Sequence, residues 1–597
     1  MESLNIGSVD NGLLYRLNRY DSNDIEKHCK PIDNLGSLQV QGRFLKEKNI
    51  YCYNITIYVL FEKGHEKHLI GDKDNLCKEL MIFYLGHAIL PFNHFYHQFY
   101  FILYIIIFIV SINGHDVPNH KHDHVHHPFF EFDHEHCHDH INHLTNKENI
   151  KIAIIGSGIG GSSCSYYINQ ELKNHNKDID YTITNYEREK VGGRTRNLDI
   201  HGDYTELGGS VVHPLNENVI KLVNDLGLKF RRANETDGTL IIWNGSDYTF
   251  SEHPIKIFNQ LKMLYNYYWS PIKFRNGRDE VVDKFLKGYN ISEPFKTVEE
   301  FYNRLGLLNV TKLTAKQYFV DKLGISKDFV ENILSAGMRV NYNQDYDSLS
   351  AFAAFIGLVG TENGLLAVDG GNYKLSEALL KSSSSNIIDE EVLEIEKVVE
   401  DEKDKKYFYI VKSKDSNGNI NTKEYDIVVI STPFEFTNIK LKGFSKDIES
   451  VPKKKYKKVH VHMLAADSIN STFFNHPNDT TINCVLTAYN KTLPFFSLCQ
   501  NTRGKLNDGR TVFKIFAPSK LEDDYLNKVL VKPELLHYHV WRAYPVLNPV
   551  EQFPSIIMDN GLFYNSAFEH SISTIETTTI ASKNTARLIS NLLSSKK

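Results

Sequence analysis

The feature that most constrains the fold is a glycine-rich turn between a short apolar segment and a segment with helical spacing. Residues 151–155, Lys-Ile-Ala-Ile-Ile, have the pattern of a buried strand, and residues 156–161, Gly-Ser-Gly-Ile-Gly-Gly, follow directly. The next residues, 162–168, have helical spacing. A G-x-G-x-x-G motif between a strand and a helix is typical of a dinucleotide-binding βαβ unit. The chain is therefore predicted to have an α/β fold built on a parallel sheet.

Each glycine of this motif has its own expected role. Gly156 permits the tight turn, Gly158 lets the backbone approach a pyrophosphate, and Gly161 lets the helix pack closely on the strand. The N-terminus of the helix offers unpaired N–H groups to the phosphates. We therefore predict cofactor contacts at all three glycines.

Glu187 stands at the end of the next expected strand, residues 181–186. Its carboxylate is placed to accept hydrogen bonds from both ribose hydroxyls, and it would repel a 2′-phosphate. Glu187 therefore favours FAD or NAD over NADP. Arg188, the next residue, is included in the predicted cofactor site.

Two further glycine pairs favour FAD over NAD. The sequence Gly-Gly-Arg at residues 192–194 comes soon after Glu187, and Gly-Gly-Ser follows at residues 208–210. Paired glycines let the backbone pass close to a bulky ligand, and Arg194 can offer a fork of donors to the pyrophosphate. The Gly-Gly-Arg sequence resembles the signature of the flavin amine oxidase superfamily. We predict cofactor contacts at Gly193, Arg194, Gly209 and Ser210.

Later segments supply the other parts that a flavin domain of that superfamily needs. Residues 367–375 resemble its second Gly-Gly turn, and Val392 lies in the following strand, where superfamily members contact the adenine through the backbone. Residues 425–433 have the pattern of a buried parallel strand. Glu576 begins a final helix, where the superfamily binds the ribityl and pyrimidine end of the flavin.

The predicted architecture is therefore an FAD-binding Rossmann-like domain assembled from discontinuous segments, together with an α+β substrate-binding domain. The FAD-binding segments are residues 149–224, 365–440 and 551–597. The substrate domain consists of residues 225–364 and 441–550.

Four segments resemble the prenylcysteine oxidase family, whose members are also called prenylcysteine lyases. They are residues 208–216, 338–344, 367–372, and 543–545 together with 553–557. The resemblance extends over most of the chain from residue 150 onwards. It implies an FAD-dependent oxidation of S-farnesyl- or S-geranylgeranyl-cysteine. Oxygen would be the acceptor, and cysteine, a prenyl aldehyde and hydrogen peroxide would be the products.

The sequence does not identify a general base. Hydride abstraction from a carbon stabilised by sulfur and an allyl group needs little proton chemistry, so positioning over the flavin supplies most of the catalysis. The candidate catalytic residues are His213, Arg339 and Tyr342. A buried structural role is the more common one for a residue such as His213. Arg339 would hold either the substrate carboxylate or a structural acid.

A C15 or C20 chain requires a long apolar pocket. Residues 255–269 carry apolar groups at roughly helical spacing, and residues 349–358 are nearly all apolar. Because such stripes are more often core than lipid pocket, we expect core packing for both.

Two other functions stay open on the sequence alone. The first is an amine or polyamine oxidase of the same fold, which would want an acidic pocket mouth and an aromatic cage. The second is a catalytically silent lipid-binding homologue, with or without flavin. The intact glycine clusters and Glu187 argue against a flavin-free version.

The charge balance disfavours a nucleic-acid partner. Lys and Arg number 68 against 73 Asp and Glu, and the formal net charge is −5. Residues 115–148 contain eleven histidines among acids and are expected to form a solvated, disordered linker. No catalytic metal is expected, because such sites draw their ligands from separate elements of a rigid fold.

The N-terminal region has a different character. Residues 99–112 are apolar and uncharged, which is too short for a confident membrane span and suits a signal-peptide core or an uncleaved anchor. We expect a leader of doubtful status over residues 1–80 and a signal segment over residues 81–114. With the lysosomal setting of the family, this predicts a lysosomal, lumenal or secreted protein with membrane association through residues 99–112. Cys484 and Cys499 would then form a disulfide.

Seven N-x-S/T sequons permit glycosylation without arguing for it, because a region so rich in Asn contains about this number by chance. They begin at Asn234, Asn244, Asn290, Asn309, Asn470, Asn478 and Asn490.

Overall fold

The structure is a computed structural model that divides the chain into two compact units, residues 1–130 and 131–597. It describes residues 36–42, 55–61, 149–200, 203–233, 238–362, 364–401, 406–449, 451–477 and 481–594. In the first unit, β1 (Gly36–Gly42) pairs antiparallel with β2 (Ile55–Phe61). The expected signal segment, 81–114, and the histidine-rich tract, 115–148, lie outside the described residues.

The second unit contains a six-stranded sheet. Its order is β11-β4-β3-β15-β25-β24, and all neighbours are parallel except the last pair. The strands are β3 (Asn149–Ile155), β4 (Asp180–Tyr186), β11 (Asn386–Ile388), β15 (Ile427–Ile430), β24 (Ile557–Asp559) and β25 (Leu562–Tyr564). Three separated parts of the chain thus build one sheet. The predicted α/β fold and its discontinuous assembly are confirmed.

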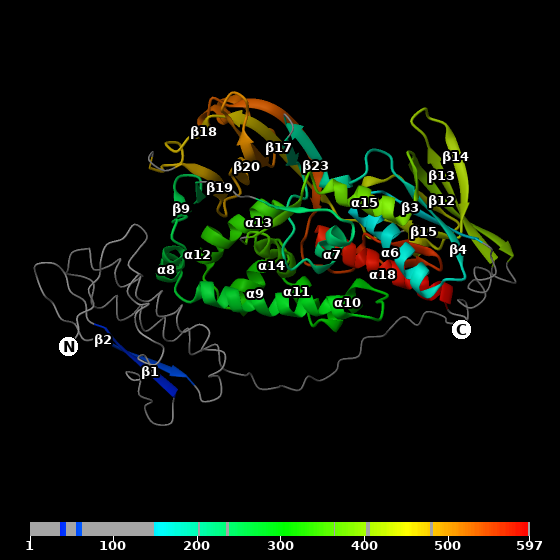
Figure 1. Ribbon diagram of the computed structural model, residues 1–597, viewed down its shortest axis with the longest axis horizontal. Helices are drawn as coiled ribbons and strands as arrows, with labels where there is room; N and C mark the ends of the chain where they lie inside the picture. Colours follow the sequence, from blue (N-terminus) through cyan, green and yellow to red (C-terminus); the bar gives the residue numbers. More distant parts are fainter. Residues whose placement is uncertain are drawn as a thin grey trace, which may run out of the picture. The chain divides into compact units, whose positions relative to one another are not determined.

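Two helices from opposite ends of this unit pack together beside the sheet. Figure 1 shows α6 (Ile159–His175), in cyan, next to α18 (Ile575–Ser594), in red. Small polar residues allow the close approach: Ser163 Oγ donates to Ser582 Oγ at 2.9 Å, and Ser582 Oγ donates to the Gly160 carbonyl at 2.9 Å. The C-terminal segment is therefore fixed against the glycine-rich turn.

A smaller sheet of order β14-β13-β12-β16 and two further helices accompany this domain. The strands are β12 (Glu391–Asp401), β13 (Lys406–Lys414), β14 (Ile420–Tyr425) and β16 (Lys440–Lys442). The helices are α7 (Glu217–Asp225) and α15 (Tyr373–Ser383). Three two-stranded pairs complete the minor sheets: β5 (Asn197–Ile200) with β6 (Asp203–Glu206), β7 (Phe230–Arg232) with β10 (Leu366–Val368), and β18 (Ser468–Ile469) with β22 (Leu530–Val531).

A seven-stranded sheet of order β23-β17-β21-β20-β19-β8-β9 forms the second large layer. Its strands are β8 (Thr239–Trp243), β9 (Tyr248–Ser251), β17 (Tyr456–Ala466), β19 (Ile482–Thr487), β20 (Ser497–Lys505), β21 (Thr511–Ala517) and β23 (Glu534–Pro545). Cys484 of β19 lies opposite Cys499 of β20, and the two form a disulfide of 2.01 Å. This is the expected pair. Both parts of the predicted substrate domain contribute strands, although the exact domain boundaries stay a prediction.

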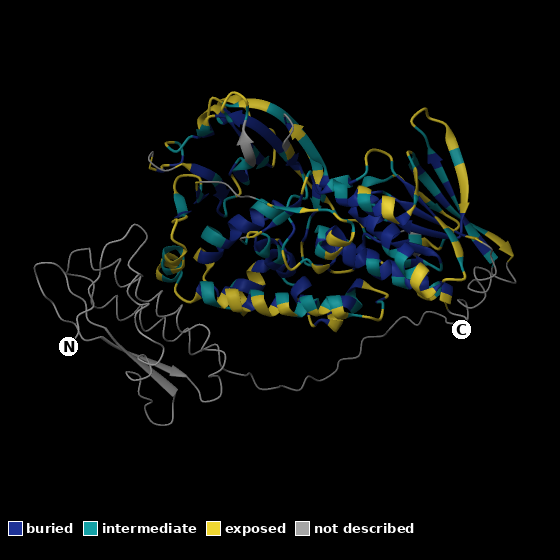
Figure 2. Ribbon diagram, viewed as in Figure 1, coloured by how far each residue is buried: buried dark blue, intermediate teal, exposed yellow. Residues whose placement is uncertain are grey.

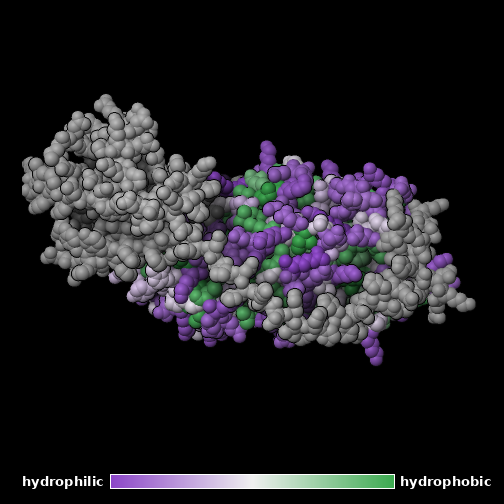
Figure 3. Space-filling model, turned by 90° about the horizontal axis from the view of Figure 1, so that it is seen from below, coloured by the Kyte–Doolittle hydropathy of each residue, from purple (hydrophilic) through white to green (hydrophobic). Residues whose placement is uncertain are grey.

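Helices fill the space below the seven-stranded sheet in the view of Figure 1. They are α8 (Lys256–Tyr267), α9 (Ser270–Leu286), α10 (Val298–Arg304), α11 (Leu308–Thr311), α12 (Lys327–Phe329), α13 (Ser335–Tyr342) and α14 (Ala351–Val359), with the short α16 (Lys446–Glu449) and α17 (Asp523–Val529) elsewhere. On the face seen in Figure 3, polar side chains separate the apolar areas. Within the described ranges, no helix combines the length and the apolarity that crossing a bilayer requires.

The two apolar stripes expected to form core behave differently. Residues 351–355 of α14 are fully buried, as expected. None of the residues of α8 is buried, and Figure 2 shows this helix in yellow and teal. The expectation of core packing for residues 255–269 is therefore wrong, because α8 lies at the surface with only one side against the body.

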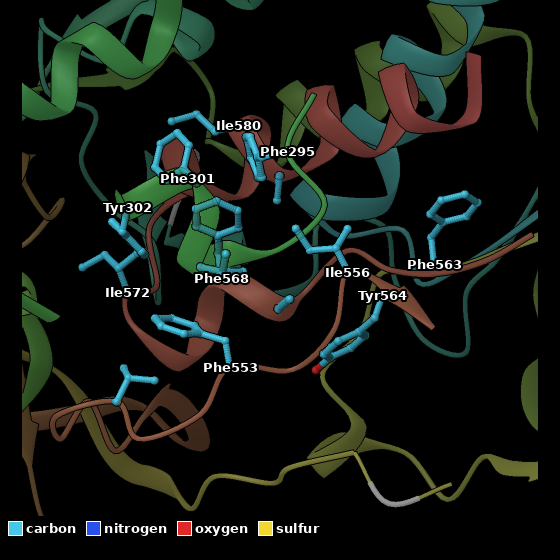
Figure 4. Close-up of a cluster of buried hydrophobic side chains, with 14 of the residues drawn as sticks. Phe295, Phe301, Tyr302, Phe553, Ile556, Phe563, Tyr564, Phe568, Ile572 and Ile580 are labelled. Carbon is cyan, nitrogen blue, oxygen red and sulfur yellow. The ribbon is translucent and has the colours of Figure 1, made fainter. Parts of the chain in front are cut away.

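An aromatic cluster joins the helices to the C-terminal segment (Figure 4). Phe568 lies 5.2 Å from Phe301 and 5.7 Å from Phe295, measured between ring centroids. The Tyr302 and Ser571 hydroxyls are 2.8 Å apart. This cluster holds the last segment of the chain between the two layers, where it also forms part of the site described next.

Candidate cofactor and substrate site

A first cavity of about 630 Å³ lies at the carboxyl ends of β3 and β4. Eight predicted contacts line it: Gly156, Gly158, Glu187, Arg188, Gly193, Arg194, Gly209 and Val392. Ser210 and Glu576 line a second cavity, and Gly161 lines neither of the two. Ligands of open α/β sheets bind outside the carboxyl ends of the strands.

The glycine-rich turn has the geometry that its sequence predicts. Gly156 has a φ of +98°, which favours glycine, and its N–H donates to the Tyr186 carbonyl at 2.8 Å. A Cβ atom at Gly161 would lie 1.8 Å from the carbonyl oxygen of Gly156, so only glycine fits between α6 and β3. The N-terminus of α6 consequently opens on the first cavity through Gly158, Ile159 and Gly160.

Glu187 is held at the rim of the first cavity. One carboxylate oxygen accepts from the Ser157 N–H at 2.9 Å and the other from the Glu189 N–H at 3.0 Å. Arg188 donates to the Phe436 carbonyl at 3.0 Å, and its side chain is 43% exposed. An acid next to a turn that approaches phosphates is the arrangement that recognises an unphosphorylated ribose.

Arg194 makes contacts that its sequence position does not indicate. Its guanidinium forms a short ion pair with Glu569. One nitrogen also donates to Ser573 Oγ and to the Ala543 carbonyl, both at 3.3 Å. Arg194 therefore lines the first cavity and also links the Gly-Gly-Arg turn, residues 192–194, to the C-terminal segment.

Taken together, the residues of the first cavity fit a dinucleotide. A helix N-terminus without a side-chain cap faces the cavity, glycines leave the backbone accessible at the turns beside it, and an acid stands at the ribose position. Val392 of β12 is buried and also lines this cavity.

The second cavity has a volume of about 950 Å³, within the range typical of small-molecule sites. Apolar and aromatic side chains from α9, the turn after it, α13, α14 and the seven-stranded sheet contribute much of its surface: Leu240, Val282, Phe285, Leu286, Tyr289, Val340, Tyr342, Ile356, Val359, Leu486, Phe516 and Tyr544.

The two cavities meet at a common boundary, which we call the shared wall. It consists of Gly208, Gly209, Tyr544, Ser573, Thr574 and Ile575, the residues that line both cavities. Ligands in the two cavities would therefore contact the same residues.

Lys514 of β21 is the cation of the second cavity next to the shared wall. Its Nζ donates to the Glu206 carbonyl at 3.1 Å and to Ser210 Oγ at 3.4 Å. Burial lowers the pKa of Lys514 to about 8, although the Glu206 carboxylate acts in the opposite direction. A half-buried ammonium group in an apolar cavity favours a ligand that carries an anionic group.

Glu206 lies behind Lys514 and is almost fully buried. Oε1 accepts from the Asn372 N–H at 2.7 Å, whereas Oε2 has no hydrogen-bond partner in the described structure. Burial raises the pKa of Glu206 to about 7, despite the lowering effect of the Asn372 N–H. Lys514 is therefore not locked in a close ion pair.

His213 lines the second cavity, but both of its ring nitrogens have partners. Nδ1 accepts from the Leu215 N–H at 3.1 Å, and Nε2 lies 3.4 Å from Glu362 Oε2. The hydrogen bond from His213 lowers the pKa of Glu362, and Arg278 adds to the effect. The geometry gives His213 a structural role, which is the alternative that the sequence favours.

Arg339 lines neither cavity. It is 1% exposed, its Nη1 lies 2.6 Å from Asp345 Oδ1, and its Nε donates to Thr487 Oγ1 at 2.9 Å. Of the two roles proposed for Arg339, the geometry therefore supports the contact with a structural acid.

Tyr342 lines the second cavity and packs edge-on against Tyr544, with 5.4 Å between ring centroids. Burial raises the pKa of Tyr342 well above its usual value, so the hydroxyl stays protonated. Tyr342 is the one catalytic candidate that adjoins the shared wall.

The Glu576 carboxylate contacts the first turn of α7. Its two oxygens accept from the N–H groups of Asn218 and Val219, both at 3.0 Å. Burial raises the pKa of Glu576 to about 7, although these two N–H groups lower it. The carboxylate caps α7, and a contact of Glu576 with the cofactor stays a prediction.

Lys514, Tyr544 and Glu569 are not among the predicted site residues, although Tyr544 lies in residues 543–545, one of the segments that resemble the family. No motif contains Lys514, and the available signal was a lysine between buried Phe513 and Ile515 of an apolar strand. Glu569 meets Arg194 across 375 residues of sequence, which no local pattern reveals.

Two substitutions in the same motif should have different effects. A methyl group at Gly158 would lie 3.6 Å from Gly193, an ordinary contact, whereas one at Gly161 would collide with the Gly156 carbonyl. We expect Gly158→Ala to keep the fold but lose bound dinucleotide. Gly161→Ala should also lower the free energy of unfolding, by about 1–3 kcal/mol.

Bound dinucleotide is measured by the absorbance of the cofactor that heating releases. Stability is measured by thermal unfolding followed by circular dichroism, with the wild type, Gly158→Ala and Gly161→Ala all compared after removal of the cofactor. Equal destabilisation by the two variants in that state would contradict the packing role assigned to Gly161.

Comparisons with known proteins agree with this geometry. The prenylcysteine lyase family model matches residues 250–597, and that of an NAD(P)-binding Rossmann-like domain matches residues 154–226. Prenylcysteine oxidase 1 of Homo sapiens is 33% identical over 461 residues, which cover 73% of this chain and 88% of the relative. Farnesylcysteine lyase of Arabidopsis thaliana is 29% identical over 459 residues, which cover 73% and 87%.

Among solved structures, a triple mutant of putrescine oxidase matches with a TM-score of 0.50 at 15% sequence identity. The match covers 74% of this chain and 98% of that one. This similarity concerns the fold alone.

Proposed function

The chain belongs to the prenylcysteine lyase family, and we propose that it is an FAD-dependent oxidase that cleaves the thioether of S-prenyl-L-cysteine. The observation that carries the proposal is the shared wall, where a dinucleotide cavity meets a large, mainly apolar cavity in which the Lys514 ammonium group lies next to that wall. Farnesyl- and geranylgeranyl-cysteine have the complementary chemistry, namely a long apolar tail and a carboxylate.

The first cavity would hold FAD. The N-terminus of α6 would receive the pyrophosphate, Glu187 the ribose and Val392 the adenine, and the shared wall is left for the flavin end of the cofactor. FAD bound there would supply a two-electron acceptor for the hydride of the prenyl carbon next to sulfur, with oxygen as the final acceptor and hydrogen peroxide as its product. Water would convert the oxidised thioether to the prenyl aldehyde and free cysteine.

The second cavity would bind the prenyl chain. Each buried CH₂ group contributes about 0.8 kcal/mol, so the apolar surface from α9 and α14 supplies most of the affinity. Lys514 would bind the carboxylate and place the thioether at the shared wall. The neutral Tyr342 and Tyr544 rings would pack against the first isoprene unit.

Anaerobic titration of the purified protein with farnesylcysteine tests the function directly. We expect the visible flavin absorbance to bleach in proportion to added substrate and to return when air is admitted. The same titration with putrescine serves as the control. A flavin that putrescine bleaches and farnesylcysteine does not would contradict the proposal and favour the amine oxidase alternative.

Lys514→Met should impair substrate binding in a pH-dependent manner. Only the protonated ammonium binds a carboxylate, so in the wild type the KM for farnesylcysteine should rise as the pH increases through about 8. Loss of a charged hydrogen bond costs about 1.5–3 kcal/mol, so the variant should show a KM about 10- to 100-fold higher at pH 7 and no rise near pH 8.

S-farnesylcysteamine, which lacks the carboxylate, is the matched substrate. Its KM should be the same for the wild type and Lys514→Met. An equal loss with both substrates would contradict a carboxylate-binding role for Lys514.

We also propose a lysosomal or otherwise lumenal or secreted location. The Cys484–Cys499 disulfide supports an oxidising compartment, and two of the sequon asparagines, Asn290 and Asn309, are exposed. Expression in eukaryotic cells should give a glycosylated protein whose N-terminus follows residue 114. An unglycosylated protein retained in the cytosol would contradict this location.

A further inference from the structure

Helix α8 and the turn that follows it expose a concentration of large apolar side chains. Of the thirteen such side chains exposed among the described residues, five lie between positions 255 and 269. Their exposed fractions are Ile255 52%, Ile257 37%, Tyr265 70%, Tyr268 68% and Trp269 41%. Scattered single residues of this kind are ordinary, but a cluster marks an interaction site.

The helix has apolar side chains on two opposite sides. Met263 and Tyr267 pack against the main core, and the Tyr267 ring lies 5.1 Å from that of Phe329. Ile257 and Tyr265, eight residues apart, point to solvent. A helix that is apolar on both sides is normally covered by other apolar groups on both sides. We therefore expect the outer side of α8 to contact a partner.

Charge indicates the kind of partner. Between Glu252 and Asp279 the sequence contains no acidic residue. The exposed basic residues of this stretch are Lys256, Lys262, Lys273 and Arg275. The chain as a whole has a net charge of −5, so this is a local positive surface on a weakly acidic protein. Exposed Tyr and Trp between lysines are typical of elements that lie at a membrane interface.

We propose that α8 and the turn to α9 lie on the surface of an anionic lipid bilayer. The tyrosines and Trp269 would enter the headgroup region, and Lys262, Lys273 and Arg275 would contact the lipid phosphates. This contact is separate from residues 99–112, the segment in which the sequence places the membrane association.

If the proposed function holds, the position of α8 lets this membrane contact assist the entry of substrate. His253, Pro254 and Lys256, at the start of the helix, line the second cavity. A bilayer that touches α8 therefore touches the mouth of the cavity that would bind the prenyl chain. A prenylated substrate dissolved in the bilayer can enter without passing through water, where each exposed CH₂ costs about 0.8 kcal/mol.

Tryptophan quenching by brominated lipids tests the contact at one residue. The chain has three tryptophans: Trp243 is buried, Trp541 lines the first cavity, and Trp269 stands at the start of α9. With vesicles of brominated phosphatidylcholine and phosphatidylserine, the full chain should lose part of its emission. Trp269→Phe should abolish that loss.

Paired variants separate the contribution of the basic side chains from that of the apolar side chains. Lys262→Glu with Arg275→Glu should weaken binding to phosphatidylserine vesicles by at least about 25-fold, since each basic residue contributes about fivefold near an anionic surface. The same reversal at the exposed Lys457 and Lys458 is the control. Ile257→Gln with Tyr265→Gln should remove the quenching, whereas Val399→Gln with Ile420→Gln, also exposed, should not.

Two results would overturn the inference. Binding to vesicles without quenching of Trp269 would place the membrane contact elsewhere in the chain. If the wild type self-associates without vesicles and Ile257→Gln with Tyr265→Gln abolishes that association, a second copy of the chain covers α8.

The quenching needs no turnover, so it succeeds or fails independently of the proposed oxidase activity. For the role in substrate entry, the α8 variants should lower kcat/KM for farnesylcysteine presented in vesicles. They should leave kcat/KM unchanged for a short-chain thioether in solution.

Discussion

The close contact between α6 and β3 at Gly161 is the constraint on which the rest of the site depends. Because no side chain separates the helix from the strand there, the N-terminus of α6 opens on the first cavity. The same tight packing lets Ser163 and Gly160 meet Ser582 of α18, which brings the C-terminal segment beside the turn. That segment then supplies half of the shared wall. One glycine contact thus determines where the cofactor and substrate cavities join.

The residues that line each cavity determine which ligand it suits. The first combines the N-terminus of α6, the glycine turns and Glu187 with apolar side chains such as Val392, so it suits a dinucleotide. The second is mainly apolar, and a cation with a lowered pKa, Lys514, adjoins the shared wall. An apolar chain would fill the second cavity at low cost, whereas an anionic end group would be stabilised beside the Lys514 ammonium. We therefore propose that polarity orients the substrate, with its reacting carbon at the shared wall.

The sequence predicted those parts of the fold and site that depend on local backbone geometry. Gly156, Gly158 and Glu187 were identifiable because a turn, a close approach and a strand end each require a particular residue type within a few positions. The Arg194–Glu569 ion pair and the cap that Glu576 provides for α7 could not be predicted, since they join residues hundreds of positions apart. Residues 255–269 were misjudged because periodicity shows that a helix has an apolar side but not whether the protein itself covers it.

The central claim is that the thioether lies at the shared wall between the two cavities. A crystal structure of the FAD-loaded protein with S-hexadecyl-L-cysteine, whose saturated carbon next to sulfur resists oxidation, tests it most directly. The account predicts the sulfur beside Gly208 and Gly209, the carboxylate on Lys514 Nζ, and the alkyl chain between α9 and α14. An alkyl chain outside the second cavity, or a sulfur atom away from the flavin, would contradict it.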